Sequence, residues 1–167
     1  MLKLNNKYLS GDFDFDFDSD LYDTFSKFEC IKNNLTGFKN IPQNLKSLNC
    51  AFNQIENLDN INDGLEILIC CGNKIKILNN LPLNLVYLDC EFNELIQLDY
   101  LPVSLIELNC GHNNITSLDN LPIELLVLNC ESNKLIELNN LPHKLKELKY
   151  SNNVGLKKIK SKCFNGF

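Results

Sequence analysis

The chain has 167 residues, of which 44% are hydrophobic, and it carries a formal net charge of −5 at pH 7. The length predicts a single domain, and the negative charge disfavours nucleic acid as a partner. No apolar run is long enough to cross a membrane, and the first ten residues lack the apolar stretch of a secretory signal. Together with eight cysteines, these features predict a reduced protein of the cytoplasm.

The N-terminal segment, residues 1–21, contains a strict alternation of aromatic and acidic residues. Phe13, Phe15 and Phe17 alternate with aspartates, and this period of two predicts a strand with one aromatic and one acidic face. We expect the aromatic face to cap the repeats that follow. The spaced aspartates also resemble the start of a calcium-binding loop, although no register supplies both its glycine and its glutamate. Calcium binding is therefore an alternative for this segment.

Residues 22–159 repeat with a step of 20 residues, in about seven units. One unit contains Leu85, Leu88, Cys90, Asn93 and Leu95, which reads LxxLxCxxNxL, and a second half of the form xxLxxLP follows it. Three columns of residues recur at this step: Cys30, Cys50, Cys70, Cys90, Cys110 and Cys130; Asn33, Asn53, Asn73, Asn93, Asn113, Asn133 and Asn153; and Pro42, Pro82, Pro102, Pro122 and Pro142, with Asn62 as the one substitute in the proline column.

This unit resembles the leucine-rich repeat, with cysteine in one leucine position. The LPxxLxxL phrase and the short period are similar to the bacterial-type class of secreted effectors. The many Asn and Ile residues, with a cysteine in nearly every unit, are also similar to leucine-rich-repeat proteins of giant DNA viruses. The resemblance implies a curved right-handed solenoid with short parallel strands on its concave face. By family this is an α/β repeat fold.

The return path of each unit is expected to lack helices, so that the fold is nearly all-β. A unit of this length has no room for a full helix, and the proline column favours an extended convex side with turns. Strands are predicted near residues 28, 48, 68, 88, 108, 128 and 148.

The cysteine and asparagine columns are interpreted as structural. Leu88 and Cys90 are two residues apart and so point to the same side of a strand, into the core. A thiol there behaves as a small hydrophobic group, and we predict reduced cysteines, with zinc or disulfides as the alternative. The asparagines are expected to bond backbone groups of the turn. Cys71 and Cys163 lie outside the column, and Cys71 is expected to face outward as the most reactive thiol.

The C-terminal end is basic and loses the register. After Asn153 the chain has Ile159 where residue 158 was due, and residues 160–167 form a basic tail. Residues 143–167 hold seven lysines and one acid, whereas residues 1–30 hold three lysines and seven acids. We expect a monomer, with head-to-tail association through the oppositely charged ends as the alternative.

The outward-facing strand positions predict a protein-binding surface on the concave face. An apolar and aromatic centre edged by charge is typical of such surfaces. The predicted partner-binding residues are Ile67, Ile69, Tyr87, Asp89, Glu91, Phe92, Glu107, Asn109 and His112. We therefore predict a protein-interaction module, an adaptor or effector. A structural or self-assembling protein is the first alternative, and a calcium- or zinc-binding protein is the second.

Catalysis is not expected. His112 and His143 are the only histidines, and two rungs, about 10 Å, separate His112 from Cys71. The sequence contains no glycine-rich phosphate loop, nucleophile elbow or metal signature. We predict no enzymatic activity and no cofactor.

Overall fold

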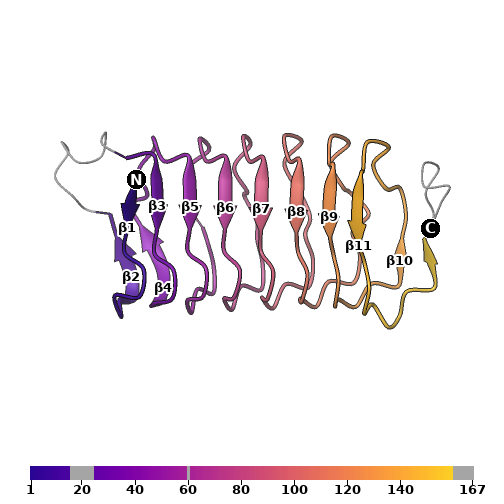
Figure 1. Cartoon of the computed structure of the whole chain (residues 1–167), viewed down its shortest axis with the longest axis horizontal. Helices are drawn as coiled ribbons and strands as arrows, with labels where there is room; N and C mark the ends of the chain where they lie inside the picture. The colour runs from indigo at the N-terminus through magenta and orange to yellow at the C-terminus, as the bar shows by residue number, and fades with distance from the viewer. Residues whose placement is uncertain (16–24, 60, 160–167) are drawn as a thin grey trace.

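The computed structural model describes residues 1–15, 25–59 and 61–159. Phe17, Cys163 and the predicted tail 160–167 lie outside these ranges. The described chain winds as a stack of coils whose strands lie side by side (Figure 1). Eight strands form one parallel sheet, in the order β1 (Leu2–Lys3), β3 (Lys27–Glu29), β5 (Ser47–Asn49), β6 (Ile67–Ile69), β7 (Tyr87–Asp89), β8 (Glu107–Asn109), β9 (Val127–Asn129) and β11 (Glu147–Lys149).

Each strand lies in register with its equivalent 20 residues further on. Leu48 is paired with Leu68, and Leu68 with Leu88. One 20-residue unit with its strand is called a rung below. All seven strands predicted from the repeat are present, and the prediction of a parallel sheet is confirmed.

The return side of the coils is built from turns and short extended segments. Its strands are β2 (Ser10–Asp14), which pairs with β4 (Asn34–Lys39), and β10 (Glu137–Leu138), which pairs with β12 (Lys158–Ile159). The proline column makes the turn before β5, β7, β8, β9 and β11, as where the Pro82 carbonyl accepts the Leu85 amide at 3.1 Å, and Asn62 takes this place before β6. The described residues contain no helix, so none with the length and apolarity needed to span a bilayer, and the nearly all-β prediction is confirmed.

Leucine and cysteine side chains fill the space between the two sides. Leu88, Cys90 and Leu95 of one rung are fully buried, as are their equivalents on the rungs from β5 to β9, whereas Leu148 and Tyr150 at β11 are only partly buried. Column thiols also donate to backbone carbonyls of the next rung, as from Cys110 Sγ to the carbonyl oxygen of Asn129 at 3.3 Å; the same contact is made by Cys30, Cys50, Cys90 and Cys130. All seven described cysteines are free. Burial raises the pKa of the Cys90 thiol well above its usual value, which fits a core residue.

The asparagine column ties neighbouring rungs together. The Asn113 side chain donates to the carbonyls of Cys90 at 3.0 Å, Cys110 at 3.2 Å and Gly111 at 3.0 Å, while its oxygen accepts the Leu95 amide at 3.0 Å. One buried amide thus satisfies backbone groups of its own rung and of the preceding one, and its predicted structural role is confirmed. The same contacts recur at Asn53, Asn73, Asn93, Asn133 and Asn153.

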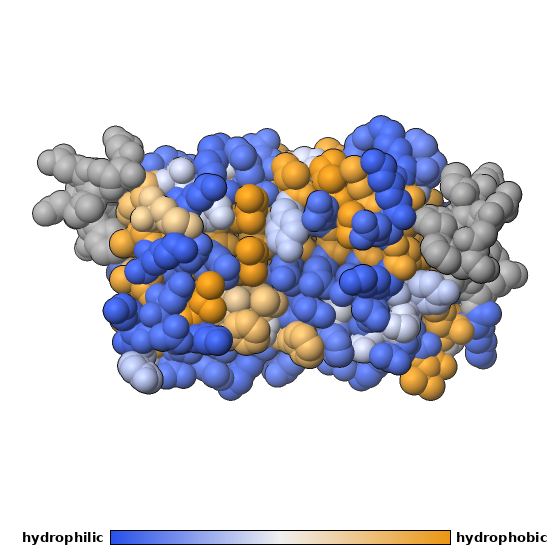
Figure 2. All heavy atoms as spheres, viewed as in Figure 1, coloured by the Kyte–Doolittle hydropathy of each residue, from blue (hydrophilic) through white to orange (hydrophobic). Residues whose placement is uncertain are grey.

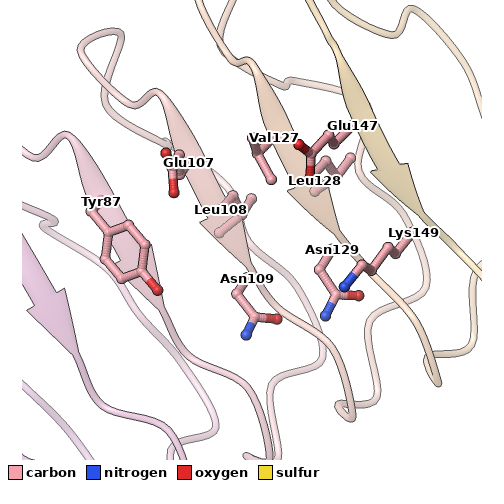
Figure 3. Close-up of a pocket in the computed structure, with 9 residues that line it drawn as sticks. All are labelled: Tyr87, Glu107, Leu108, Asn109, Val127, Leu128, Asn129, Glu147 and Lys149. Carbon is pink, nitrogen blue, oxygen red and sulfur yellow. The ribbon is translucent and has the colours of Figure 1, made fainter.

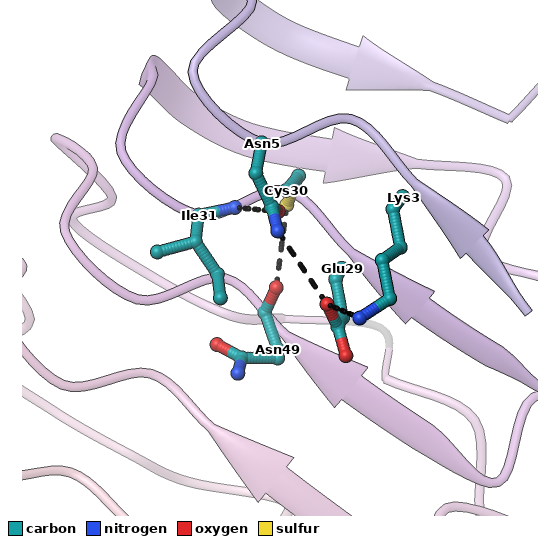
Figure 4. Close-up of polar contacts among 6 residues, drawn as sticks. All are labelled: Lys3, Asn5, Glu29, Cys30, Ile31 and Asn49. Atoms are coloured by element: carbon teal, nitrogen blue, oxygen red, sulfur yellow. Dashed lines mark hydrogen bonds and ion pairs between the residues drawn. The ribbon is translucent and has the colours of Figure 1, made fainter.

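The first rung was missed by the sequence interpretation. β1 pairs with β3, and the Lys3 ammonium lies 2.8 Å from the Glu29 carboxylate, which holds the pKa of Glu29 below its usual value. Asn5 accepts the Ile31 amide at 2.8 Å, which fastens the turn after β1 (Figure 4). This rung is 26 residues from the next, because Leu2 pairs with Phe28, so the 20-residue step does not reveal it.

Aromatic side chains close the N-terminal end of the core. Phe15 is fully buried, and its ring centroid lies 4.8 Å from that of Phe28. Phe13 packs on the same ring at 5.1 Å and on Phe38 at 6.4 Å. The two described phenylalanines of the alternation therefore point to the core, as the period of two predicts.

At the C-terminal end the one-residue slip is visible in the strand pairing. Leu138 in β10 is paired with Ile159 in β12, a step of 21 residues instead of 20. The predicted loss of register after Asn153 is confirmed.

Replacement of a ladder asparagine should strongly destabilise the fold. Asn113→Ala leaves buried carbonyls and the Leu95 amide without this partner, and we expect the free energy of unfolding to fall by at least about 3 kcal/mol. Urea unfolding followed by circular dichroism measures the loss. The control is Asn79→Ala, because Asn79 is exposed and should change stability by less than about 0.5 kcal/mol. Equal effects of the two substitutions would contradict the bridging role.

Candidate functional site

The outward surface of the eight-stranded sheet, here named the sheet face, carries the predicted partner-binding residues. In β7 the central Leu88 is buried, whereas Tyr87 and Asp89 on either side are partly exposed. The register places Tyr87 between Ile67 and Glu107, and Asp89 between Ile69 and Asn109. Glu91, Phe92 and His112 follow in the turns after β7 and β8. The structure thus gathers all nine predicted residues on three neighbouring rungs.

An aromatic stack lies in the turns at the edge of the sheet face where the strands end. The rings of Phe92 and His112 are parallel within 13°, with centroids 4.1 Å apart. Both residues have a left-handed backbone, with φ near 52° and 51°, which is uncommon for residues with side chains. Gly72 occupies the equivalent position one rung earlier, where a Cβ would lie 2.6 Å from the Phe52 ring. Phe52, Phe92 and His112 thus present exposed rings from equivalent positions in these turns.

The centre of the sheet face is acidic and lacks cations. Among the described residues, none of the ion pairs involves Asp89, Glu91 or Glu107. Partial burial is the main cause that raises the pKa of Asp89, and the neighbouring Glu91 charge adds to it. Burial and then the charges of Asp89 and Glu107 raise the pKa of Tyr87. This surface therefore holds an uncompensated negative potential.

The fold does not require the charge of Asp89. Its Oδ1 accepts the Glu91 amide at 3.1 Å, a contact that closes the turn after the strand. Asparagine makes the same contact on other rungs, as where Asn129 accepts the Glu131 amide at 3.1 Å. A neutral amide thus suffices for the turn, and the carboxylate at Asp89 adds charge at an energetic cost.

A hollow of about 180 Å³ opens on the sheet face beside Tyr87 (Figure 3). It shares Tyr87, Glu107 and Asn109 with the predicted site and extends toward the C-terminal end. The lining residues that the sequence interpretation missed are Leu108, Val127, Leu128, Asn129, Glu147 and Lys149. The available signal was the strand alternation, which places Val127, Asn129, Glu147 and Lys149 on the same outward face as Tyr87.

Cys71 faces outward, as predicted, and is the least buried of the seven described thiols. It is partly buried, and burial raises its pKa to about 12, with Asp89 and Glu91 adding their charges. The reactive thiolate is therefore disfavoured. In the described chain, moreover, no group of three or more His, Cys, Asp or Glu side chains is placed to hold a metal ion.

The in-register parallel strands, the 20-residue step and the asparagine ladder define a leucine-rich-repeat solenoid. The chain is thus a leucine-rich-repeat protein with 20-residue repeats, as predicted. Its structure is similar to YopM from Yersinia enterocolitica WA-314, with a TM-score of 0.79 and 34% sequence identity over 82% of this chain and 30% of YopM. It is also similar to the leucine-rich-repeat domain of a Shigella effector, with a TM-score of 0.74 and 32% identity over 79% of this chain and 60% of that domain.

A third similar structure has a related core. The functional domain of InlJ from Listeria monocytogenes, which includes a cysteine ladder, matches with a TM-score of 0.56 and 25% identity, over 80% of this chain and 41% of that domain. The chain thus spans less than two thirds of the length of each of these three proteins. Neither a protein-family model nor a curated protein matches the sequence.

Alkylation of Cys71 should be slow in the folded protein at about pH 8, because the raised pKa keeps the thiolate scarce. Asp89→Asn removes an adjacent negative charge and should speed the reaction about threefold or more. Mass spectrometry of the Cys71 peptide after timed iodoacetamide exposure gives the rate. Glu56→Gln, which changes an exposed acid on the return side, should leave the rate unchanged. An unaltered rate in Asp89→Asn would contradict the electrostatic cause.

The same Asp89→Asn substitution should stabilise the fold at about pH 7. The pKa of Asp89 is raised in the folded state, so the ionised form costs stability wherever the carboxyl is charged in both states. This cost disappears as the pH falls below the pKa of the unfolded chain. Urea unfolding at about pH 7 and about pH 2.5 should therefore show a gain only at the higher pH. An equal gain at both values would show that the charge is not its source.

Proposed function

We propose that the sheet face binds a segment of another protein and that Tyr87 lies at the centre of the contact. The similarity to leucine-rich-repeat effectors supports a protein-interaction module. The observation that carries the proposal is an aromatic side chain, Tyr87, that lies between carboxylates without an ion pair and lines a hollow extending from β7 to β11. Partly exposed aromatic residues within a charged rim are typical of interface centres.

The charge of the surface favours a segment with Lys or Arg beside apolar side chains. A cation close to Asp89 and Glu107 would compensate the negative potential that raises the pKa values of Asp89 and Tyr87. The apolar neighbours of that cation would contact Ile67, Ile69 and the exposed ring of Phe92, which is 50% exposed. Asn109 and the Phe92–His112 stack border the same area.

Binding accounts for these residues better than catalysis does. The only described thiol on the sheet face, Cys71, has a raised pKa, and the His112 ring is stacked on Phe92. We therefore propose an adaptor or effector role without enzymatic activity or a cofactor, in a reducing cytoplasm that keeps the thiols free. The sequence resemblance to giant-virus proteins remains a prediction.

The described acids of the N-terminal run contact side chains in and next to β4, which favours a structural role for them over calcium binding. Asp12 accepts the Thr36 hydroxyl at 2.8 Å and lies 3.4 Å from the Lys39 ammonium. Asp14 accepts the Asn40 amide at 2.9 Å. These contacts fasten β2 to β4, and they explain why acids alternate with the capping phenylalanines.

Selection of random peptides displayed on phage tests both the site and the chemistry. Wild-type protein should enrich peptides in which Lys or Arg adjoins apolar residues. The triple variant Tyr87→Ala, Asp89→Ala, Phe92→Ala should bind the selected peptides at least about 30-fold more weakly, since central interface residues each contribute about 2 kcal/mol or more. Calorimetric titration of the synthetic peptides measures the affinities.

The matched control is Asp99→Ala with Tyr100→Ala. These residues provide an exposed acid and an exposed ring in a turn of the return path, so the control should retain full affinity. Equal binding by the triple variant would place the site off the sheet face. Enrichment of acidic instead of basic peptides would overturn the proposed partner chemistry.

A further inference from the structure

A second apolar surface lies along the edge where the strands begin. On the rungs of β7, β8 and β9, the turn before each strand presents two aliphatic side chains, which are exposed except for the half-buried Ile106 and Leu126. This edge strip consists of Leu83, Val86, Val103, Ile106, Ile123 and Leu126. Leu83, Val103 and Ile123 are 72%, 79% and 60% exposed. Figure 2 shows apolar side chains gathered along this upper edge, over β8 and β9.

The fold does not impose these apolar residues. The positions of Leu83, Val103 and Ile123 are taken on the other rungs by Gln43, Asp63 and His143. Those of Val86, Ile106 and Leu126 are taken by Lys46, Glu66 and Lys146. Because identical turns on neighbouring rungs accept polar and charged side chains, the aliphatic residues of the edge strip need an explanation outside the core.

Charges of opposite sign border the edge strip. On the rung before it, at β6, Asp63 and Glu66 are exposed acids. On the rung after it, at β11, Lys144 and Lys146 are exposed cations. The two charged rungs are equally far, two rungs each, from the central rung of Val103 and Ile106. The apolar edge strip is therefore bordered by acidic residues at one end and by basic residues at the other.

We propose that the edge strip joins two copies of this chain in an antiparallel, two-fold dimer. The axis passes through the rung of Val103 and Ile106, so that each of these residues meets its own equivalent in the second copy. The rung of Val86 then faces that of Leu126. The acidic rung faces the basic rung twice, and Glu66 lies opposite Lys146 of the second copy. Apolar contact in the centre and charge pairing at both ends are satisfied together.

The charges select this arrangement over the parallel one. In a parallel dimer each rung faces its own equivalent, so Glu66 would meet Glu66 and Lys146 would meet Lys146, which is repulsive. Within one chain Lys46 lies 3.2 Å from Glu66, while Lys146 forms no ion pair among the described residues. Lys146 is therefore available to a second copy.

The antiparallel arrangement leaves both sheet faces open. An axis that reverses the direction of the solenoid and joins the two upper edges keeps the sheet faces on the same side of the dimer. The assembly would thus present two copies of the Tyr87 surface in one plane. Since six aliphatic side chains form a small interface, we expect a weak dimer, with a dissociation constant of about 10–100 µM.

Sedimentation velocity over about 5–500 µM of the full chain tests the proposal. Wild type should pass from monomer to dimer, and Val103→Lys, which brings two cations together at the axis, should weaken the dimer by at least about tenfold. The matched control Gln43→Lys adds the same charge at the equivalent position of a remote rung and should keep the dimer. Thermal unfolding monitors the fold of each variant. A wild-type monomer at every concentration would overturn the proposal, as would a dimer that Val103→Lys leaves intact.

A charge exchange tests the antiparallel register. Glu66→Lys and Lys146→Glu should each weaken the dimer by about tenfold, because each faces two like charges against one another. The double variant Glu66→Lys, Lys146→Glu restores opposite charges across the axis and should recover the wild-type dissociation constant. Failure of the double variant to recover it would exclude this register.

Discussion

The side-chain amide that bonds backbone groups of two rungs at once is the interaction on which this structure depends. Asn113 satisfies carbonyls of Cys90, Cys110 and Gly111 and the amide of Leu95, so it fixes the turn and joins it to its neighbour. A buried turn without such a partner would leave several backbone groups unsatisfied, at about 1–3 kcal/mol each. Each amide needs the strand and turn of the neighbouring rung in equivalent positions, whereas the length of the return path can vary, as the 26-residue step between β1 and β3 shows.

The buried asparagine amides and the inward leucines and cysteines hold the coils together. Core packing therefore does not restrict which residues stand at the outward positions. Repetition then supplies a reference within a single chain, because the same backbone position can be compared on six or seven rungs. Asn129 closes the turn that Asp89 closes, so the charge of Asp89 is an addition. Glu66 and Lys146 occupy the position of Ile106, so the aliphatic side chain there is an addition as well. Such departures point to function more directly than composition does.

Periodicity accounts for what could be predicted from the sequence and for what could not. The strands β3 to β11 of the main sheet follow from the step, and the strand alternation gives the outward direction of Tyr87 and Asp89. The strand β1 was not predicted because its rung is 26 residues from the next and has Lys7 where the ladder has asparagine. The hollow was not predicted because it is formed jointly by residues of four strands, β7, β8, β9 and β11, whose packing the repeat pattern does not give. The raised pKa of Cys71 could not be predicted because its causes, burial and then the charges of Asp89 and Glu91, depend on how the next rung packs against it.

The two proposed surfaces are compatible because adjacent residues of one rung point in different directions. Val86 belongs to the edge strip, whereas Tyr87 belongs to the sheet face, so contact at one surface does not cover the other. A partner with two basic segments could then engage both sheet faces of an antiparallel dimer, and the second contact would form within the same complex. Such linkage raises the overall affinity without any new contact, provided that the connection between the segments spans the two faces. A short solenoid with a modest surface on each copy could in this way bind firmly only to partners that repeat the motif.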